Sequence, residues 1–192
     1  VESLRADRHG RASATWFQLK DIPALLPQLA EIDTLVIARV RYDAEVARLI
    51  ATARSHGVRI LFDCDDLVFD TRYVHLILDT LAQGKSHEDL DWWFAYIGRI
   101  EATARLCDGG ITTNECLAER MEEVVQGPVR IVPNFLNRLQ QEVSDHLIAA
   151  KRMRQYAGDG PLTIGYFSGT PSHKQDFEIV IKAVCRILDR YP

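Results

Sequence analysis

Four carboxylates follow one apolar segment of the chain closely enough to act together. Residues 60–62 read I-L-F, and the next residues, D-C-D-D-L-V-F-D, place carboxylates at Asp63, Asp65, Asp66 and Asp70. Like charges this close repel one another, so some of these groups must be hydrogen-bonded, metal-bound or protonated. Carboxylates so placed can serve as general bases, nucleophiles or metal ligands. The cluster is the first candidate for a chemical site, although Asp65 or Asp66 can also simply cap loop amides.

One interpretation of this cluster is a haloacid-dehalogenase-like phosphatase, whose first motif is an apolar strand followed by D-x-D and then Thr. Asp63 would then be the nucleophile and Asp65 the general acid, and both would hold Mg²⁺. Leu67 stands where that motif has Thr. No paired acidic motif that would complete a metal site is recognisable downstream. We keep the phosphatase as an alternative.

Strand-like and helix-like segments alternate around this cluster. Residues 34–40 read T-L-V-I-A-R-V, a near-continuous apolar run that is typical of a strand buried on both faces of a parallel sheet. Further predicted strands are 58–62, 109–112 and 129–132, and the predicted helices are 43–56, 87–106 and 115–125, the last capped by Asn114. This alternation predicts an α/β fold with a Rossmann-like, doubly wound parallel sheet. Ligands of such sheets bind beyond the carboxyl ends of the strands, where the carboxylate cluster lies.

The chain changes character after residue 137. A polar helix is predicted over 139–156 and is broken by G-D-G-P at 158–161. A strand over 162–167 and a helix over 175–191 follow, which together make one βα unit. We therefore expect a first domain over 1–137, a linking helix over 138–160 and the start of a second Rossmann-like domain over 161–192.

Three segments, taken in order, resemble one family of enzymes. They read F-D-C-D-D-L-V-F-D at 62–70, A-R-L-C-D-G-G-I-T-T-N-E-C-L-A-E-R-M with V-R-I-V-P-N-F-L-N at 104–121 and 129–137, and I-G-Y-F-S-G-T-P-S-H-K-Q-D-F at 164–177. The family is the group 1 (family four) nucleotide-sugar glycosyltransferases of GT-B fold, particularly bacterial members linked to O-antigen and other surface polysaccharides. The resemblance covers about residues 22–192.

The resemblance implies two Rossmann-like domains across a cleft, with the acceptor mainly on the first and the nucleotide-sugar donor mainly on the second. Residues 168–170 would form a loop whose amides approach the donor diphosphate. Cations just beyond that loop would offset phosphate charge, and the Pro-Asn turn at the end of the first domain would lie near the donor pocket. The donor-binding residues so implied are Ser168, Gly169, Thr170, His173, Lys174 and Asn134.

On the first domain, the resemblance places Asp65 and Asp66 toward the cleft, where one of them would orient or deprotonate the acceptor hydroxyl. Arg39 and Arg41 end the earlier strand and would meet an anionic acceptor. The acceptor implied is a surface polysaccharide or a lipid-linked glycan. No cofactor and no metal are expected, because GT-B transferases generally work without a bound metal. A non-catalytic interaction module of the same fold remains an alternative.

The aromatic residues of the predicted helix 87–106 have a less specific meaning. Trp92, Trp93, Phe94 and Tyr96 are expected to form core or an interface, with a sugar platform as the alternative. The basic run at 151–154 is expected to face solvent, with contact to anionic lipid as its alternative. The apolar face of helix 175–191 suggests self-association of the chain.

Composition narrows the partners and the compartment. The chain has 192 residues, with 23 Lys and Arg against 27 Asp and Glu and a net charge of −4. Because no basic stripe dominates, we expect no nucleic-acid partner. The 4 cysteines form no C-x-x-C pair and are expected to be reduced core thiols. Without a signal-peptide core or an apolar run of the ~18 residues a membrane span needs, a cytoplasmic protein is expected, with peripheral contact at the inner membrane face as an option.

The family's strongest donor signature, a spaced pair of Glu late in the second domain, is not recognisable in the chain, nor is its usual first strand with a Gly-rich loop. We therefore expect the sequence to represent a fragment of such a transferase. On its own it should transfer little or no sugar.

Overall fold

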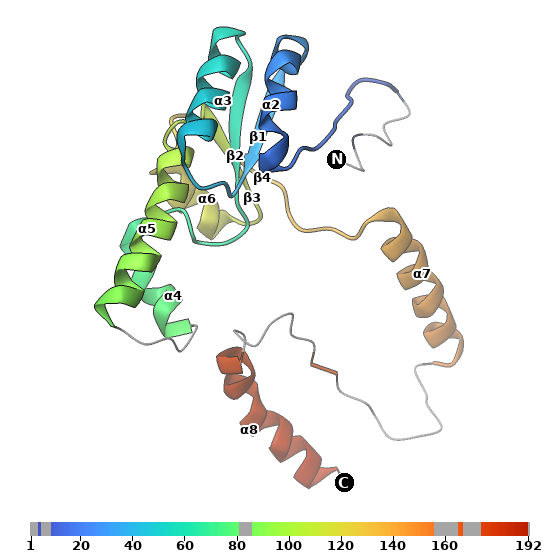
Figure 1. The fold of residues 1–192 in the computed structure, drawn as a ribbon. Helices are drawn as coiled ribbons and strands as arrows, with labels where there is room; N and C mark the ends of the chain where they lie inside the picture. Colours follow the sequence, from blue (N-terminus) through green and yellow to red (C-terminus); the bar gives the residue numbers. More distant parts are fainter. Residues whose placement is uncertain (1–3, 5–8, 81–85, 156–164, 167–173, 192) are drawn as a thin grey trace.

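The chain folds around a four-stranded parallel sheet. The structure is a computed structural model that describes residues 4, 9–80, 86–155, 165–166 and 174–191 (Figure 1). The strands are β1 (Thr34–Ala38), β2 (Arg59–Asp63), β3 (Gly109–Thr112) and β4 (Val129–Ile131), in the spatial order β1-β2-β3-β4. All neighbouring pairs are parallel, with Ile37 opposite Phe62 and Phe62 opposite Gly110. The predicted α/β class and parallel sheet are confirmed, and the sheet is consistent with a Rossmann-like fold.

Each predicted helix is present, with ends that differ from the prediction by a few residues. The short helical segments within 19–31 and 71–80 were not predicted. Pro23 and Pro27 each lie in the first turn of one of these segments, where a missing amide hydrogen costs nothing. The helices are η1 (Leu19–Asp21), α2 (Ile22–Leu25), η2 (Leu26–Glu31), α3 (Ala44–Ser55), η3 (Thr71–Tyr73), α4 (Val74–Thr80), α5 (His87–Ala104), α6 (Glu115–Glu122), α7 (Arg138–Met153) and α8 (Lys174–Arg190).

Local chemistry explains where the crossover helices begin and end. The Asp43 carboxylate accepts hydrogen bonds from the amides of Glu45 and Val46 at 3.0 and 2.9 Å and so starts α3. Gly57, with φ of 74°, follows α3 in the left-handed conformation that ends many helices. The predicted cap of α6 is also confirmed, because Asn114 accepts from the Leu117 amide at 3.0 Å.

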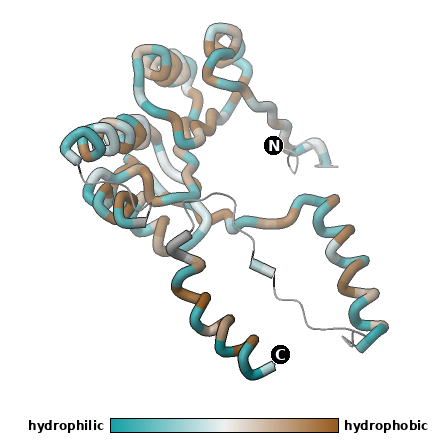
Figure 2. Tube along the Cα trace, turned by 60° about the horizontal axis from the view of Figure 1, so that its bottom comes forward, coloured by the Kyte–Doolittle hydropathy of each residue, from teal (hydrophilic) through white to brown (hydrophobic). Residues whose placement is uncertain are grey.

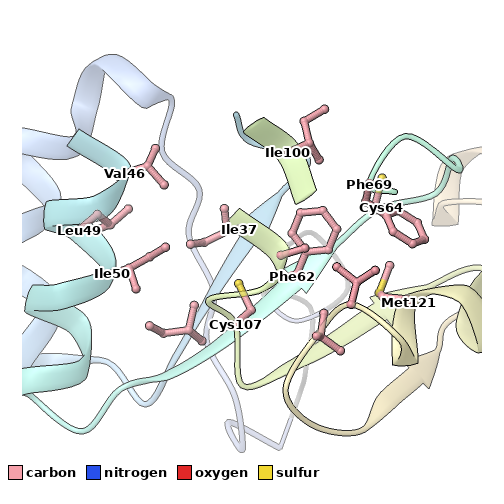
Figure 3. Close-up of a cluster of buried hydrophobic side chains, with 14 of the residues drawn as sticks. Ile37, Val46, Leu49, Ile50, Phe62, Cys64, Phe69, Ile100, Cys107 and Met121 are labelled. Carbon is pink, nitrogen blue, oxygen red and sulfur yellow. The ribbon is translucent and has the colours of Figure 1, made fainter. Parts of the chain in front are cut away.

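One hydrophobic core lies on one face of the sheet. Figure 3 shows Val46, Leu49 and Ile50 of α3 pointing toward the strands, where Ile37 and Phe62 belong to the same buried cluster. Residues of α5 and α6 complete the cluster from the same side, including Ile100, Ala104, Leu117 and Met121. Gly110 permits the close approach of α6, since a Cβ at this position would overlap the Met121 sulfur.

The opposite face of the sheet is open among the described residues. Side chains alternate along a strand, so Val36, Leu61 and Ile111 share the face that points away from Ile37 and Phe62. Val36 is 46% exposed, and Leu61 and Ile111 are only half-buried. The expectations that the first strand is buried on both faces and that the sheet is doubly wound are both wrong for the described residues. Three successive crossovers that move in one direction place their helices on one face when each is right-handed, which leaves the other face uncovered.

The two C-terminal helices lie away from the sheet. Figure 1 shows α7 and α8 apart from the strands, and Figure 2 shows apolar and polar residues alternating along both. No residue of α7 is buried, although Leu139, Val143 and Leu147 align along one side of it. The predicted strand over 162–167 falls outside the described residues except for 165 and 166, which are not in a strand. Within the described parts of the chain, none of the helices combines the length and apolar character that crossing a membrane requires.

Candidate functional site

Arg39 links the ends of β1 and β2 at the carboxyl edge of the sheet. Its Nη1 donates a hydrogen bond to the Asp66 Oδ2 at 2.6 Å and lies 3.8 Å from the Asp65 Oδ1. The side chains of Asp65 and Asp66 are 63% and 57% exposed, so both carboxylates remain open to a ligand. The structure thus brings together three of the predicted site residues. One of them, Arg39, already has carboxylate partners.

The backbone of Arg39 adopts a conformation that few residues other than glycine tolerate. Its φ is 52°, in the left-handed region. The Arg39 amide still donates to the Asp63 carbonyl at 2.9 Å, so the β1–β2 ladder continues up to this residue. Such strain persists only where the surroundings hold it, and it concentrates at functional sites. The turn directs the Arg39 side chain across the sheet edge toward the loop after β2.

The loop that carries Asp65 and Asp66 is anchored from below. Cys64 is buried, its amide donates to the Ile111 carbonyl at 3.2 Å, and its carbonyl accepts from the Thr112 hydroxyl at 2.8 Å. On the other side of the exposed pair, Val68 and Phe69 are buried in the core. Fixed at both ends, the loop holds its two exposed carboxylates on a rigid base, which favours a defined binding geometry.

Burial shifts the two titratable groups that precede the exposed pair. It raises the pKa of the half-buried Asp63 carboxyl, and the neighbouring Asp65 carboxylate adds to the effect. Burial also raises the pKa of the Cys64 thiol to about 11. A thiol with such a pKa is protonated near neutral pH and is a poor nucleophile. Cys64 is therefore a weak candidate for a reactive group, and the exposed carboxylates are the stronger candidates at this edge.

Asp70, the fourth carboxylate, has a structural role. It is 2% exposed and accepts hydrogen bonds from the Arg72 amide and from the Arg72 Nε, at 2.9 and 3.0 Å. Burial opposes ionisation of Asp70, but the Arg72 hydrogen bonds outweigh it and lower the pKa of the carboxyl. Arg72 also reaches Glu123 at 2.7 Å, which ties the loop to α6. Sequence reasoning missed this network, and the only signal for it was Asp70 directly before a short helix.

Arg41 faces an aromatic partner instead of a carboxylate. Its guanidinium carbon lies 5.1 Å from the centre of the Tyr96 ring on α5. The next residue, Tyr42, exchanges two hydrogen bonds with Arg99, at 2.8 and 2.7 Å, so the loop after β1 is fixed to α5. This contact was not predicted, because Arg41 and Tyr96 belong to different crossovers and lie far apart in the sequence.

The predicted donor-side residues do not join this site among the described residues. Asn134 is exposed in the segment that leads from β4 to α7. Ser168, Gly169, Thr170 and His173 lie outside the described residues, and Lys174 is the first residue of α8. Their assignment to a donor site stays a prediction.

Two of the four carboxylates in the cluster are paired with arginines. Asp66 pairs with Arg39 and Asp70 pairs with Arg72, while burial and the Asp65 carboxylate raise the pKa of Asp63. In the part of the chain that the structure describes, no group of three or more His, Cys, Asp or Glu side chains is arranged to hold a metal ion.

Two surface positions differ from the expectation of core thiols. Cys64 and Cys107 are buried as predicted, whereas Cys116 and Cys185 are exposed, so the prediction is wrong for these two. Both lie on helices, α6 and α8.

The described site is thus an open, charged sheet edge built by Arg39, Asp65 and Asp66, with Arg41 and Tyr96 beside it. In comparisons with known proteins, no family model matches the chain, no curated protein matches it, and no solved structure matches it.

Proposed function

We propose that the chain is the acceptor-side part of a GT-B glycosyltransferase that moves a sugar from a nucleotide-sugar donor to a surface-polysaccharide or lipid-linked acceptor. The observation that carries the proposal is the exposed Asp65–Asp66 pair at the carboxyl edge of a parallel sheet. That edge is where such sheets bind ligands. The three ordered sequence segments that resemble group 1 glycosyltransferases support the same assignment.

The two carboxylates differ in how closely they contact Arg39, and we assign them different roles. Asp66 is engaged at 2.6 Å by Arg39, so its charge is largely compensated by the guanidinium. Asp65 lies 3.8 Å from the same guanidinium group and is the more exposed of the pair. We therefore assign Asp65 to the acceptor hydroxyl, as hydrogen-bond acceptor and general base. Asp66 acts as a positioning residue that fixes Arg39, and Arg39 offsets negative charge on the bound acceptor.

The proposal is tested with the protein at its natural length, UDP-, GDP- and dTDP-linked sugars carrying a radiolabel, and a bacterial lipid-linked glycan extract as acceptor. Asp65→Asn should lower the transfer rate ~100-fold or more, since general base catalysis typically contributes that factor. The matched control is Glu122→Gln, an exposed carboxylate near the end of α6 that should transfer normally.

One outcome would overturn the role of Asp65, and two others would overturn the proposal as a whole. Unchanged transfer by Asp65→Asn removes the assigned base. Failure of the protein to bind UDP, GDP or dTDP by calorimetric titration supports the non-catalytic interaction module. Mg²⁺-dependent hydrolysis of an aryl phosphate that disappears in Asp63→Asn supports the phosphatase.

A further inference from the structure

The aromatic residues of α5 separate into a packed pair and two exposed rings. Trp93 and Tyr96 pack against the small core formed by Val74, Leu78 and Ile97. Trp92 and Phe94, in contrast, are 55% and 50% exposed. The two exposed residues are about 200° apart around a helix of ~3.6 residues per turn. They therefore project from opposite sides of the part of α5 that packs against this core. Only Trp92 is on the same side as Tyr96, one helical turn away.

Trp92, Tyr96 and Arg41 form a continuous stack. The rings of Trp92 and Tyr96 are parallel to within 19°, with centroids 5.2 Å apart, and the Arg41 guanidinium lies 5.1 Å from the Tyr96 centroid. Trp93 meets both rings edge-on, at 4.8 and 5.7 Å. The indole of Trp92 is thereby held in one orientation by two neighbouring rings. A side chain that is ordered before binding loses less entropy when a ligand arrives.

This stack is part of the candidate site's surroundings. Arg41 is two residues after Arg39, which pairs with Asp66, and the adjacent Tyr42 is hydrogen-bonded to Arg99 of the same helix. Figure 1 shows α5 extending past the sheet beside α4. The loop after β1 therefore joins the Arg39–Asp66 pair to α5, and Arg41 contacts the Tyr96 ring on which Trp92 stacks.

We propose that Trp92 is a glycan subsite, on which a sugar of the acceptor chain stacks while Asp65 receives the reacting hydroxyl; this inference rests on the proposed function. The chemistry suits a pyranose ring, which has an apolar face of C–H groups and a polar rim. The apolar face covers the exposed indole, through contacts that include weak C–H interactions with the ring. The indole N–H and the Arg41 guanidinium are donors for hydroxyl or acidic groups on the rim.

The ligand probe is an immobilised array of bacterial O-polysaccharides and their oligosaccharide repeats, followed by titration of the best-bound oligosaccharide. Trp92→Ala should weaken that binding about tenfold or more, which is the scale of one lost aromatic contact with its buried area. Trp92→Phe keeps a ring on Tyr96 and should restore most of the affinity. The matched control is Phe94→Ala, which removes an equally exposed ring from the other side of α5 and should bind within about twofold of the unchanged protein.

A separate arm tests a membrane surface as the occupant, using vesicles of phosphatidylglycerol and phosphatidylethanolamine. If Trp92→Ala and Phe94→Ala both lose sedimentation with vesicles while glycan binding is unchanged, the exposed rings are interfacial anchors and the subsite is refuted. Equal loss of glycan binding in Phe94→Ala, no loss in Trp92→Ala, or no bound glycan on the array also overturns it. Circular dichroism of each variant verifies that α5 remains folded.

The sugar-transfer assay separates failure of this inference from failure of the proposed function. If Asp65→Asn abolishes transfer but Trp92→Ala transfers normally with an unchanged acceptor KM, the transferase stands and the subsite does not. If the protein transfers no sugar but binds glycan, and Trp92→Ala loses that binding, the glycan subsite is supported and the transferase is not. When both hold, Trp92→Ala should raise the acceptor KM with little change in kcat.

Discussion

The two faces of the sheet are made from similar residues but have different surroundings. On one face, Ile60 and Phe62 are fully buried under α3, α5 and α6. On the other face, the adjacent residues Val36 and Leu61 are equally apolar, yet Val36 is 46% exposed and Leu61 half-buried. An apolar strand sequence thus shows that both faces of the strand could be buried. The path of the crossovers decides which face is actually covered by helices.

The same difference separates the helices. α3 and α6 bury their apolar stripes in the core, while α7 carries a stripe of Leu139, Val143 and Leu147 with no buried residue. The open sheet face and the stripe of α7 are both apolar surfaces that no described element covers. The comparison between a covered and an open face can be tested directly by mutation.

The largest expected difference is between Phe62→Ala and Val36→Ala. Phe62→Ala removes a fully buried ring and should lower the free energy of unfolding by about 3–5 kcal/mol. Val36→Ala removes two methyl groups from an exposed position and should cost less than about 1 kcal/mol. Urea denaturation followed by circular dichroism measures both. If Val36→Ala instead lowers the free energy of unfolding as much as the same change at a buried valine, the open face is covered in solution.

Two carboxylates that flank the loop after β2 should affect stability in opposite ways. Asp63 belongs to the open face, and Asp70 follows the buried Phe69. The folded-state pKa of Asp70 is lowered, so its contribution to stability is present above its unfolded pKa, near 3.9, and is lost as pH falls through the folded value. Asp70→Asn should therefore cost about 1–3 kcal/mol at neutral pH, since a charge-assisted hydrogen bond to Arg72 is lost.

Asp63 should behave in the opposite way. Its folded-state pKa is raised, so the stability it contributes is present below its unfolded pKa and is lost as pH rises through the folded value. Asp63→Asn should therefore raise the free energy of unfolding at neutral pH, and the gain should vanish in acid. Urea titrations between about pH 3 and 8 measure both variants. The same sign for the two variants would contradict the contrast.

The sequence predicted regular elements well where their ends carry a chemical signal. Asn114 caps α6 as predicted, and the predicted helix 43–56 begins at Asp43, which caps α3, and stops directly before Gly57, where α3 has ended. The short helices α2 and α4 were missed because they span only one or two turns, too few for a periodic pattern. Burial of β1 was overpredicted because it depends on the order of strands, which a local pattern does not contain.

The location of the candidate site could be predicted from the sequence, whereas the contacts within it could not. The rule that ligands meet the carboxyl ends of parallel strands pointed to Arg39 and to Asp65 and Asp66. Their pairing across 27 residues depends on the register of β1 with β2 and on the positive φ of Arg39, and neither can be read from residue types. The stack of Arg41 on Tyr96 likewise requires that two crossovers meet in space.

The smallest change to the protein is the chemical labelling of its own cysteines, which reports whether each thiol is reached by solvent. Cys64 and Cys107 are buried, and burial raises the pKa of their thiols to about 11 and about 12, so both should resist iodoacetamide in the folded protein. Cys116 and Cys185 are exposed and should react. Mass spectrometry of digested peptides identifies each labelled site, and urea-unfolded protein is the control in which all four react.

A thiol placed on each face then compares the faces within one fold. Val36→Cys on the open face should be labelled at a rate close to that of Cys116, because water reaches this position. Ile37→Cys, the next residue on the covered face, should be labelled no faster than Cys107, because both lie in the same core. Protection of Val36→Cys that disappears when α7 is made polar by Leu139→Ser and Val143→Ser would show that α7 covers this face. Protection that persists would point to another cover, and rapid labelling in both backgrounds would establish that one face of this parallel sheet remains open to solvent.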